Sequence, residues 1–382
     1  MTPAGAKTTY DRDQALFPTR ASVIAYAALG AALIAAPWLL GSYYLSQIVF
    51  VMIYAMVGVA LNILSGQAGQ VSIGHAAFLA IGAYCAAVLQ KYGLPLPVYL
   101  VLAALLTGVV GYLVGLPALR LHGIYLAIAT FAFAFIVEEI IARWESVTHG
   151  NEGLMVAPPS LFGWRLGEAG FFYLCLALTA LVMLVALNIL RSPAGRAFIA
   201  LRDSETAARS MGVDATRSKT QAFAISAAIT GLAGVLYAHK LSFITPEMFT
   251  LGLSIDFVMI IIIGGIASLR GAVFGAIFMI MVDPALVFLK DKLPQVVDGL
   301  VTGLGLGPDF AARIQGGVAR VLNAPGLKSL IFGLIIILFI IFEPLGLDGR
   351  WQRVKTYFKQ FPLYRPASAR RQKMYLKSER AR

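Results

Sequence analysis

Charged residues are scarce in this sequence. Only 13% of its 382 residues are Asp, Glu, Lys or Arg, whereas 59% are hydrophobic and the mean hydropathy is +0.79. A soluble domain carries roughly 25% charged residues. Because a charged side chain in lipid costs several kcal/mol, the deficit indicates a protein that crosses a membrane many times.

The sequence also lacks the patterns of several functional classes. Its two cysteines, Cys85 and Cys175, lie in apolar runs, which indicates small packing residues rather than a disulfide framework. The four histidines have no metal-ligand spacing, and no GxxxxGK(S/T) sequence offers a Walker-type nucleotide site. No nucleophile–base pair is evident either. We therefore expect a chain that is not an enzyme, with no catalytic residue, no metal and no cofactor.

Long apolar runs fill most of the chain. A helix needs about 20 residues to cross a bilayer, and the runs predict about ten such helices in an all-α polytopic protein. Nine runs have this length, and the tenth, 254–267, is shorter. They lie at about 21–40, 45–65, 72–90, 97–117, 122–142, 170–190, 221–239, 254–267, 271–289 and 327–342. Glycines flank 72–90 and 254–267, so either of these two spans could be broken or re-entrant.

The basic residues predict the orientation. With ten spans, 22 of the 31 Lys and Arg residues fall on the side that holds both termini. The positive-inside rule therefore places both termini in the cytoplasm of a bacterial inner membrane. We divide the chain into an N-terminal segment 1–20, a membrane domain 21–347 and a basic tail 348–382. The tail carries no aromatic platform for nucleic acid, so we assign its charge to attraction by anionic lipid.

The stretch 191–220 is the one long polar and basic interruption between apolar runs. Its order predicts a short helix with a small-residue face that ends at a glycine. A membrane subunit offers such a helix to a motor protein docked beneath it, so we expect this loop to couple the chain to a separate ATPase. The residues that we assign to coupling are Gly195, Arg196, Glu205, Ala207, Ala208 and Gly212.

Two segments rich in small residues, 66–82 and 264–276, suggest an internal repeat. Small residues allow close helix packing in lipid, but a broken helix that lines a polar pathway fits the same residues. The external loop 144–159 is either a plain turn, a gate or a contact for a delivery protein. The candidates for the substrate pathway are Gln67, Gln70, Ser72, Thr148, Asn151 and Ser268.

The sequence resembles the LivM-like permease subunits of bacterial branched-chain (hydrophobic) amino acid ABC importers. The resemblance covers most of 45–347. The matching segments include LNILSGQAGQVSIGHAAFLAIGAY (61–84), LRLHGIYLAIATFAFA (119–134), SPAGRAFIALRDSETAARSMGV (192–213) and VMIIIIGGIASLRGAVFGA (258–276). Further matches are THGNEG (148–153), ITGLAGVLYA (229–238) and EPLGL (343–347). The chain departs from the family pattern at His149, where a glycine is usual, and in the longer external insertion 290–325 and basic tail.

The resemblance implies a complex with a second, LivH-like permease, two ABC ATPase subunits and a periplasmic substrate-binding protein. It also implies that Glu205, Ala207, Ala208 and Gly212 belong to the helix that sits in an ATPase groove. We expect branched-chain or other hydrophobic amino acids as substrates. Relatives of the subunit import urea, short amides or aromatic acids, which leaves these as alternatives for the same machine. Alternatives of other classes are an ion-coupled secondary transporter, a sugar-type ABC permease and an integral membrane enzyme.

Overall fold

The computed structural model describes residues 20–119, 121, 123–161, 163–303, 327–343 and 345–360, and almost all of them are helical. The first half contains α2 (Arg20–Leu39), α3 (Ser42–Leu61), the π-helical turn η1 (Asn62–Gln67), α4 (His75–Lys91), α5 (Leu96–Ala118) and α6 (Ile124–Arg143). The second half contains α8 (Glu168–Arg191), α9 (Pro193–Asp203), α10 (Glu205–Ser210), α11 (Ala215–Leu241), α12 (Leu251–Gly264), α13 (Leu269–Gly303), α15 (Leu327–Phe342) and α16 (Gly346–Gln360).

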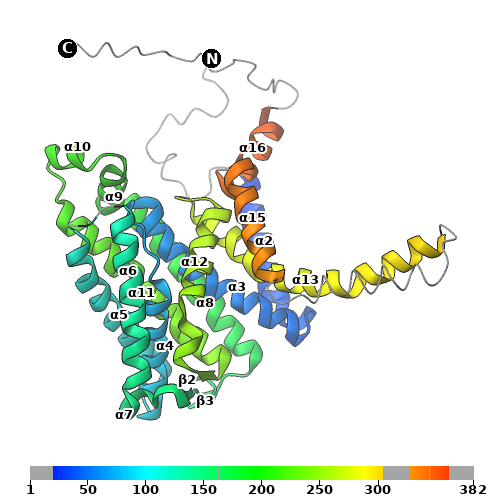
Figure 1. Cartoon of the computed structure of the whole chain (residues 1–382), viewed down its shortest axis with the longest axis horizontal. Helices are drawn as coiled ribbons and strands as arrows, with labels where there is room; N and C mark the ends of the chain where they lie inside the picture. The colour runs from blue at the N-terminus through cyan, green and yellow to red at the C-terminus, as the bar shows by residue number, and fades with distance from the viewer. Residues whose placement is uncertain are drawn as a thin grey trace.

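Short elements cap the side opposite α9, α10 and α16 (Figure 1). These are α7 (Glu145–Thr148), η2 (Gly150–Glu152), β1 (Leu154–Met155), β2 (Ser160–Leu161), β3 (Trp164–Arg165), β4 (Phe243–Ile244) and η3 (Pro246–Phe249). The strands form two antiparallel pairs, in which β1 lies beside β4 and β2 beside β3. The external loop that follows α6 is thus tied to the end of α11.

Each predicted span corresponds to a helix of the structure, and the all-α prediction is confirmed. Within the described part of the chain, six helical segments are long and apolar enough to cross a membrane by length and composition, and Val23–Leu39 forms a shorter apolar helix. The count of ten spans remains approximate. The insertion 290–325 begins within the last part of α13, whereas its residues 304–325 lie outside the described part of the chain, as do 1–19 and 361–382.

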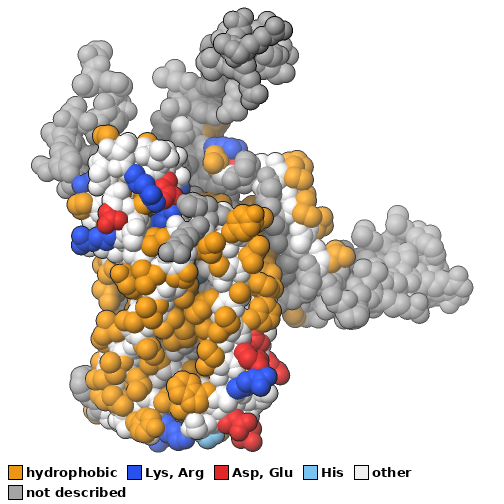
Figure 2. All heavy atoms as spheres, turned by 60° about the vertical axis from the view of Figure 1, so that its left-hand side comes forward, with side chains coloured by type: hydrophobic (Ala, Val, Ile, Leu, Met, Phe, Trp, Pro, Cys, Tyr) orange, Lys and Arg blue, Asp and Glu red, His pale blue; other side chains and the backbone are white. Residues whose placement is uncertain are grey.

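The surface has the band of apolar side chains that a membrane protein presents to lipid (Figure 2). On α5 the exposed residues recur every four positions, at Val101, Leu105, Val109 and Leu113, each more than half exposed. Four-residue spacing places them on one face of the helix. Because no polar side chain interrupts this row, we assign the face to lipid contact.

The centre of the fold is α11, in which 78% of the span is buried compared with 33% in α5. Small residues let its neighbours approach the backbone. A Cβ added to Gly82 of α4 would lie 2.6 Å from the Cα of Gly231, and one added to Gly111 of α5 would lie 2.8 Å from the carbonyl oxygen of Phe223. Helix association in lipid depends on such close packing, because lipid tails are as apolar as leucine.

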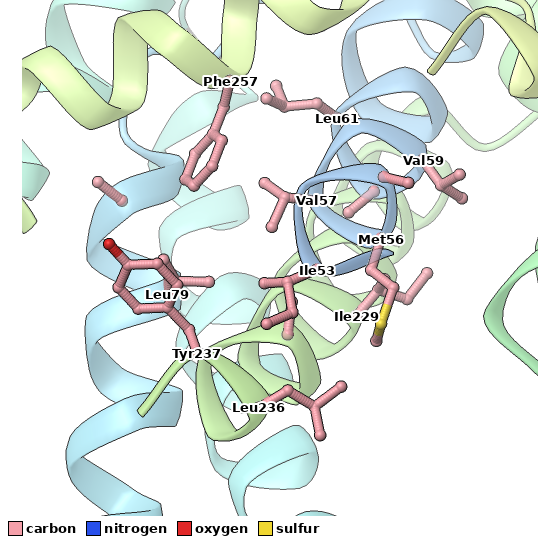
Figure 3. Packing of buried hydrophobic residues seen from close by; sticks show 14 of the residues in the cluster. Ile53, Met56, Val57, Val59, Leu61, Leu79, Ile229, Leu236, Tyr237 and Phe257 are labelled. Carbon is pink, nitrogen blue, oxygen red and sulfur yellow. The ribbon is translucent and has the colours of Figure 1, made fainter. Parts of the chain in front are cut away.

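Larger side chains fill the space on the other side of α11. Ile53 and Met56 of α3 and Leu79 of α4 pack with Ile229 and Leu236 of α11 (Figure 3). All but Ile229 are fully buried. The core therefore joins α3, α4 and α11 into one body, on which the two interrupted helices described below are built.

Candidate functional site: two interrupted helices and a coupling segment

The first interruption follows α3. Its last turn widens into η1, and residues 68–74 are non-helical before α4 begins at His75. Gly69 has a φ of +67°, a left-handed conformation that favours glycine. The predicted span 72–90 therefore corresponds to α4, which is uninterrupted, and its first three predicted residues belong to the break that precedes this helix.

A buried polar chain closes this first break. The Ser226 hydroxyl of α11 donates to the Ala60 carbonyl (2.7 Å) and lies 2.8 Å from Nε2 of His75. Nδ1 of His75 lies 3.0 Å from the hydroxyl of Ser72. Because the Ser226 proton goes to Ala60, Nε2 of His75 donates to Ser226 and Nδ1 accepts from Ser72. Backbone that leaves a helix within a membrane must find such internal partners.

The second interruption lies between α12 and α13. α12 ends at Gly264, Gly265 has a φ of +123°, and the Ser268 hydroxyl accepts a hydrogen bond from the backbone N–H of Gly271 in α13 (3.1 Å). The same hydroxyl donates to Asp348 of α16 (2.8 Å). Asp348 is 2% exposed and also accepts from Gln352 (2.6 Å). A carboxylate from the C-terminal helix therefore stabilises the second break.

The two interruptions touch each other. The Asn62 amide donates to the Ser268 carbonyl (2.6 Å), and the Gln67 amide donates to the Ala267 carbonyl (2.8 Å). A Cβ on Gly66 would lie 2.7 Å from the backbone nitrogen of Ala267. The segments 66–82 and 264–276, similar in sequence, thus meet at their helix breaks, although the contact leaves the question of a repeat open.

The predicted pathway residues fall into two groups. Gln67, Gln70, Ser72 and Ser268 lie at the breaks, and all four make hydrogen bonds within the chain. Thr148 and Asn151 lie in the loop after α6, in α7 and η2, and among the described residues no hydrogen bond joins this loop to the breaks. The structure therefore does not bring the six together, and which of them contact substrate stays a prediction.

The external loop is a set of tight turns. The Thr148 hydroxyl donates to the Ile141 and Trp144 carbonyls (2.6 and 2.8 Å), while Asn151 is exposed. His149 has a φ of +57° and a ψ of +14°, and its Nε2 lies 3.2 Å from Nζ of Lys91. The left-handed conformation explains why a glycine is favourable at this position. The loop keeps that shape with histidine in place.

The coupling loop forms two helices, where the sequence predicted one. Ser192 caps α9 by accepting from the Gly195 N–H (3.5 Å), and Pro193 occupies the first helical position. Ser204 has extended backbone that ends α9, and its hydroxyl caps α10 by accepting from the Ala207 N–H (3.3 Å). Side-chain acceptors of this kind compensate for the missing backbone partners of a helix start.

Two of the six predicted coupling residues are buried. A Cβ on Gly195 would lie 2.5 Å from the Ile189 carbonyl oxygen and the Leu190 Cα, so this glycine lets α9 pack against the end of α8. Ala208 packs with Leu201 and Ala215 in a small cluster between α9, α10 and α11. Neither residue is available to a partner, and both instead hold the coupling segment together.

The exposed coupling residues lie in two places, with Arg196 near the start of α9 and the other two in or just after α10. Arg196, Ala207 and Gly212 are exposed, and Met211 between the last two is 85% exposed. Gly212 has a φ of +84° and its N–H donates to the Arg209 carbonyl (3.0 Å), so it ends the helix as predicted. An exposed methionine beside small residues is an adaptable contact for another protein.

Glu205 faces the membrane domain. Its carboxylate binds Nζ of Lys219 (2.8 Å) in the first turns of α11 and Arg209 (2.6 Å) one turn along α10. The Lys219 side chain is 2% exposed, compared with 59% for Arg209. A buried lysine requires such a partner, so the pair fixes α10 to α11. No role was predicted for Lys219, His75 or Asp348. His75 is a polar residue inside an apolar run, which was an available signal, whereas Lys219 and Asp348 lie in polar segments that carry no such signal.

Among the described residues, no group of three or more His, Cys, Asp or Glu side chains could hold a metal ion. The site consists of two helix breaks that contact each other and of a coupling segment that is fixed to α11, the central helix of the core.

Several known proteins are similar to this chain in sequence. The chain is 37% identical over 256 residues to the high-affinity branched-chain amino acid transport system permease protein LivM of Salmonella typhimurium, an alignment that covers 60% of each chain. It is 25% identical to a probable LivM of Methanocaldococcus jannaschii (65% of this chain, 68% of the relative). It is 29% identical to the autoinducer 2 import system permease protein LsrC of Salmonella paratyphi B (71% and 79%). No solved structure matches the chain.

The family described as the branched-chain amino acid transport system / permease component matches residues 43–340, which include both helix breaks and the coupling segment. Because the match extends over most of the chain, and because the helices form a multi-pass bundle, the protein belongs to this family of inner-membrane permeases.

Proposed function

We propose that this chain is one membrane subunit of an ATP-driven importer for branched-chain or other hydrophobic amino acids. A second, LivH-like permease completes the pathway, two ABC ATPase subunits bind on the cytoplasmic side, and a periplasmic binding protein delivers the substrate. The observation that carries the proposal is the α9–α10 segment. It exposes Met211 and Ala207 at its tip while the buried Lys219–Glu205 pair anchors its base.

Transport then follows from a change in shape. ATP binding closes the ATPase dimer, the coupling helices are displaced, and the two permeases tilt about the pathway between them. The chain supplies no nucleotide site, in keeping with the lack of a Walker sequence. Selectivity is set mainly by the binding protein, so the pathway needs only a weakly polar surface that lets a zwitterion pass.

Docking at the tip of α10 is tested with Ala207→Trp. Ala207 is exposed, so the larger side chain leaves the fold intact but occupies the surface of the proposed ATPase contact. We expect normal membrane insertion, loss of ATPase co-purification and loss of ATP-dependent uptake. The matched control is Thr356→Trp, which is exposed on α16, a helix well separated from α10 (Figure 1). Normal co-purification and uptake in Ala207→Trp would overturn the assignment.

The substrate class is tested on the cognate binding protein. Leucine, isoleucine and valine are expected to raise its melting temperature, because bound ligand stabilises the native state. The similarity to LsrC, whose printed name specifies import of autoinducer 2, makes that molecule the second candidate. Urea, short amides and aromatic acids complete the panel. A shift with any of these and none with the three amino acids would overturn the substrate and leave the transporter class in place.

A further inference from the structure

The coupling segment reaches the first helix break through one arginine. Arg202 lies in the last turn of α9, and its Nη1 donates to the carbonyl of Gly66 in η1 (3.1 Å). Its other nitrogens bind the neighbouring Asp203 (2.9 and 3.0 Å). The guanidinium is thus held in one orientation by a carboxylate while it bonds to the interrupted backbone.

The backbone of the break fits closely around this side chain. Gly69 has a φ of +67°, and a Cβ added to it would lie 3.0 Å from Cγ and 3.2 Å from Cα of Arg202. Arg202 therefore contacts the break at two points, Gly66 and Gly69. Gly66 in turn packs on Ala267, so the contact extends to the second interruption.

The rest of the coupling segment is fixed at its ends. Gly195 packs α9 on the end of α8, and the buried Lys219–Glu205 pair fixes α10 to α11. The Arg202 side chain is 34% exposed, so it crosses from the surface of the segment to the break.

We propose that Arg202 transmits the displacement of the coupling helices to the first helix break, which makes it a positioning residue for transport. The inference rests on the proposed function and assigns a part of the mechanism to a residue of this chain. It requires that α9 and η1 move together during the cycle. Without Arg202, ATP hydrolysis continues but moves less substrate.

The first test compares Arg202→Gln with Arg217→Gln in the complete importer in proteoliposomes. Arg217 is exposed at the start of α11, so its replacement controls for loss of a cytoplasmic positive charge. We expect Arg202→Gln to assemble and hydrolyse ATP normally, whereas leucine imported per ATP falls about five-fold or more, the lower end of usual coupling effects. Arg202→Lys restores a single charged donor, so its leucine imported per ATP is expected to lie between the values of Arg202→Gln and Arg217→Gln. An unchanged ratio in Arg202→Gln would overturn the inference.

The second test replaces the hydrogen bond with a covalent bond. A Cβ on Gly69 would lie 3.3 Å from Cβ of Arg202, close to the roughly 3.5–4.5 Å that a disulfide spans. The variant carries Gly69→Cys and Arg202→Cys, with Cys85→Ala and Cys175→Ala to remove the native thiols. In its reduced form the variant has neither Arg202 nor a disulfide, so it is expected to import as little leucine per ATP as Arg202→Gln does. Oxidation with copper phenanthroline is expected to restore the imported leucine per ATP, and reduction to abolish it again.

The outcomes are distinct. If oxidation restores the leucine imported per ATP, α9 and η1 move together during transport. A merely structural role for Arg202 would then be excluded. Further inhibition on oxidation, or a formed disulfide without recovery, overturns the inference, because the contact would then have to open during transport. Failure of the unmodified importer to take up leucine with ATP would instead contradict the proposed function. The amount imported per ATP of whichever ligand stabilises the cognate binding protein would then serve as the readout for Arg202.

Discussion

The two helix breaks solve the same physical problem with different chemistry. At the first, neutral groups close the gap, since the hydroxyls of Ser72 and Ser226 flank the imidazole of His75, all of them at most 1% exposed. At the second, a carboxylate does so, because Asp348 accepts from Ser268 and lies 3.6 Å from Arg270. Arg270 is 42% exposed, so this site reaches the aqueous edge.

The difference follows from depth. A charge far from water is costly even when paired, whereas a hydroxyl or a neutral imidazole needs only a hydrogen-bond partner. The Ser72, His75 and Ser226 side chains of the first break lie inside the core formed by α3, α4 and α11, where neutral groups are favoured. The edge of that break, at Gly66 and Gly69, instead meets the charged Arg202. The second break lies beside α16, where an ion can be paired and partly hydrated. The distance from water therefore determines whether the free backbone groups of a break are stabilised by neutral hydrogen-bonding side chains or by a charged one.

The largest expected effect comes from crowding a break. Gly264→Ala places a methyl group on the Gly271 backbone, which cannot move aside, so α12 and α13 must separate. We expect a loss of about 3 kcal/mol of stability, the upper end of the usual range for overpacking. Gly74→Ala at the first break meets the Thr130 backbone and is expected to cost a similar amount. Thermal unfolding of the detergent-solubilised protein measures both.

The control for this crowding effect lies on the same helix. A Cβ on Gly252 of α12 meets only the Thr250 hydroxyl, at 3.5 Å. Gly252→Ala is therefore expected to change stability by less than about 1 kcal/mol, and to raise it if it changes at all. A melting temperature for Gly264→Ala equal to that of Gly252→Ala would contradict the close contact between α12 and α13.

The next effect separates the two breaks. Ser226→Ala leaves both Nε2 of His75 and the Ala60 carbonyl buried without their partner, for a loss of about 2–3 kcal/mol. Ser268→Ala removes a half-buried hydroxyl, but its carboxylate partner keeps Gln352 and Arg270, so the change is expected to cost about 1 kcal/mol. Ser210→Ala, an exposed hydroxyl on α10, serves as the control. Equal losses at Ser226 and Ser268 would contradict the role of depth.

A smaller effect tests charge at the second break. Asp348→Asn keeps the shape of the side chain and one acceptor, and we expect a loss of about 1–2 kcal/mol. The loss should shrink in high salt, because screening already weakens the interaction with the half-exposed Arg270. The loss in Ser226→Ala should not depend on salt. A loss in Asp348→Asn that is the same in low and high salt would count against a charge-based closure.

The smallest effect concerns Arg270 itself. Its Nε lies 3.6 Å from Asp348 and its side chain is exposed at 42%, a geometry typical of weak ion pairs. Arg270→Gln is expected to lower stability by less than about 1 kcal/mol. The melting temperature in dilute buffer, compared with that of Arg217→Gln, measures it. If Arg270→Gln lost as much stability as Asp348→Asn, the ion pair with Arg270 would account for the whole stabilising effect of the Asp348 carboxylate, and this prediction would be wrong.

Much of this architecture could be predicted from the sequence, because it depends on local composition. Apolar runs of membrane length indicated the spans, and flanking glycines marked the two segments that begin or end at a helix break. Gly212 ends α10 because a left-handed residue is a local requirement. Polarity alone located the coupling segment between α8 and α11.

The remainder depends on contacts between distant parts of the chain. Asn62 and Ser268 are 206 residues apart, and His75 and Ser226 are 151 apart, so no local pattern indicates either pair. The division of the coupling residues into buried and exposed also depends on the tertiary fold. Glu205 was expected at the ATPase contact, whereas its carboxylate is bound to Lys219. Arg202 was passed over because a basic residue in a basic loop has no distinguishing local feature.

The central claim is that another subunit's ATP hydrolysis drives transport through this chain. The most direct measurement is uptake of radiolabelled leucine into proteoliposomes that hold the chain, its partner permease, both ATPases and external binding protein. The account predicts uptake that requires ATP inside the vesicles, stops when an ATPase is omitted and is indifferent to a sodium or proton gradient. Uptake driven by such a gradient in vesicles that contain this chain alone would contradict it.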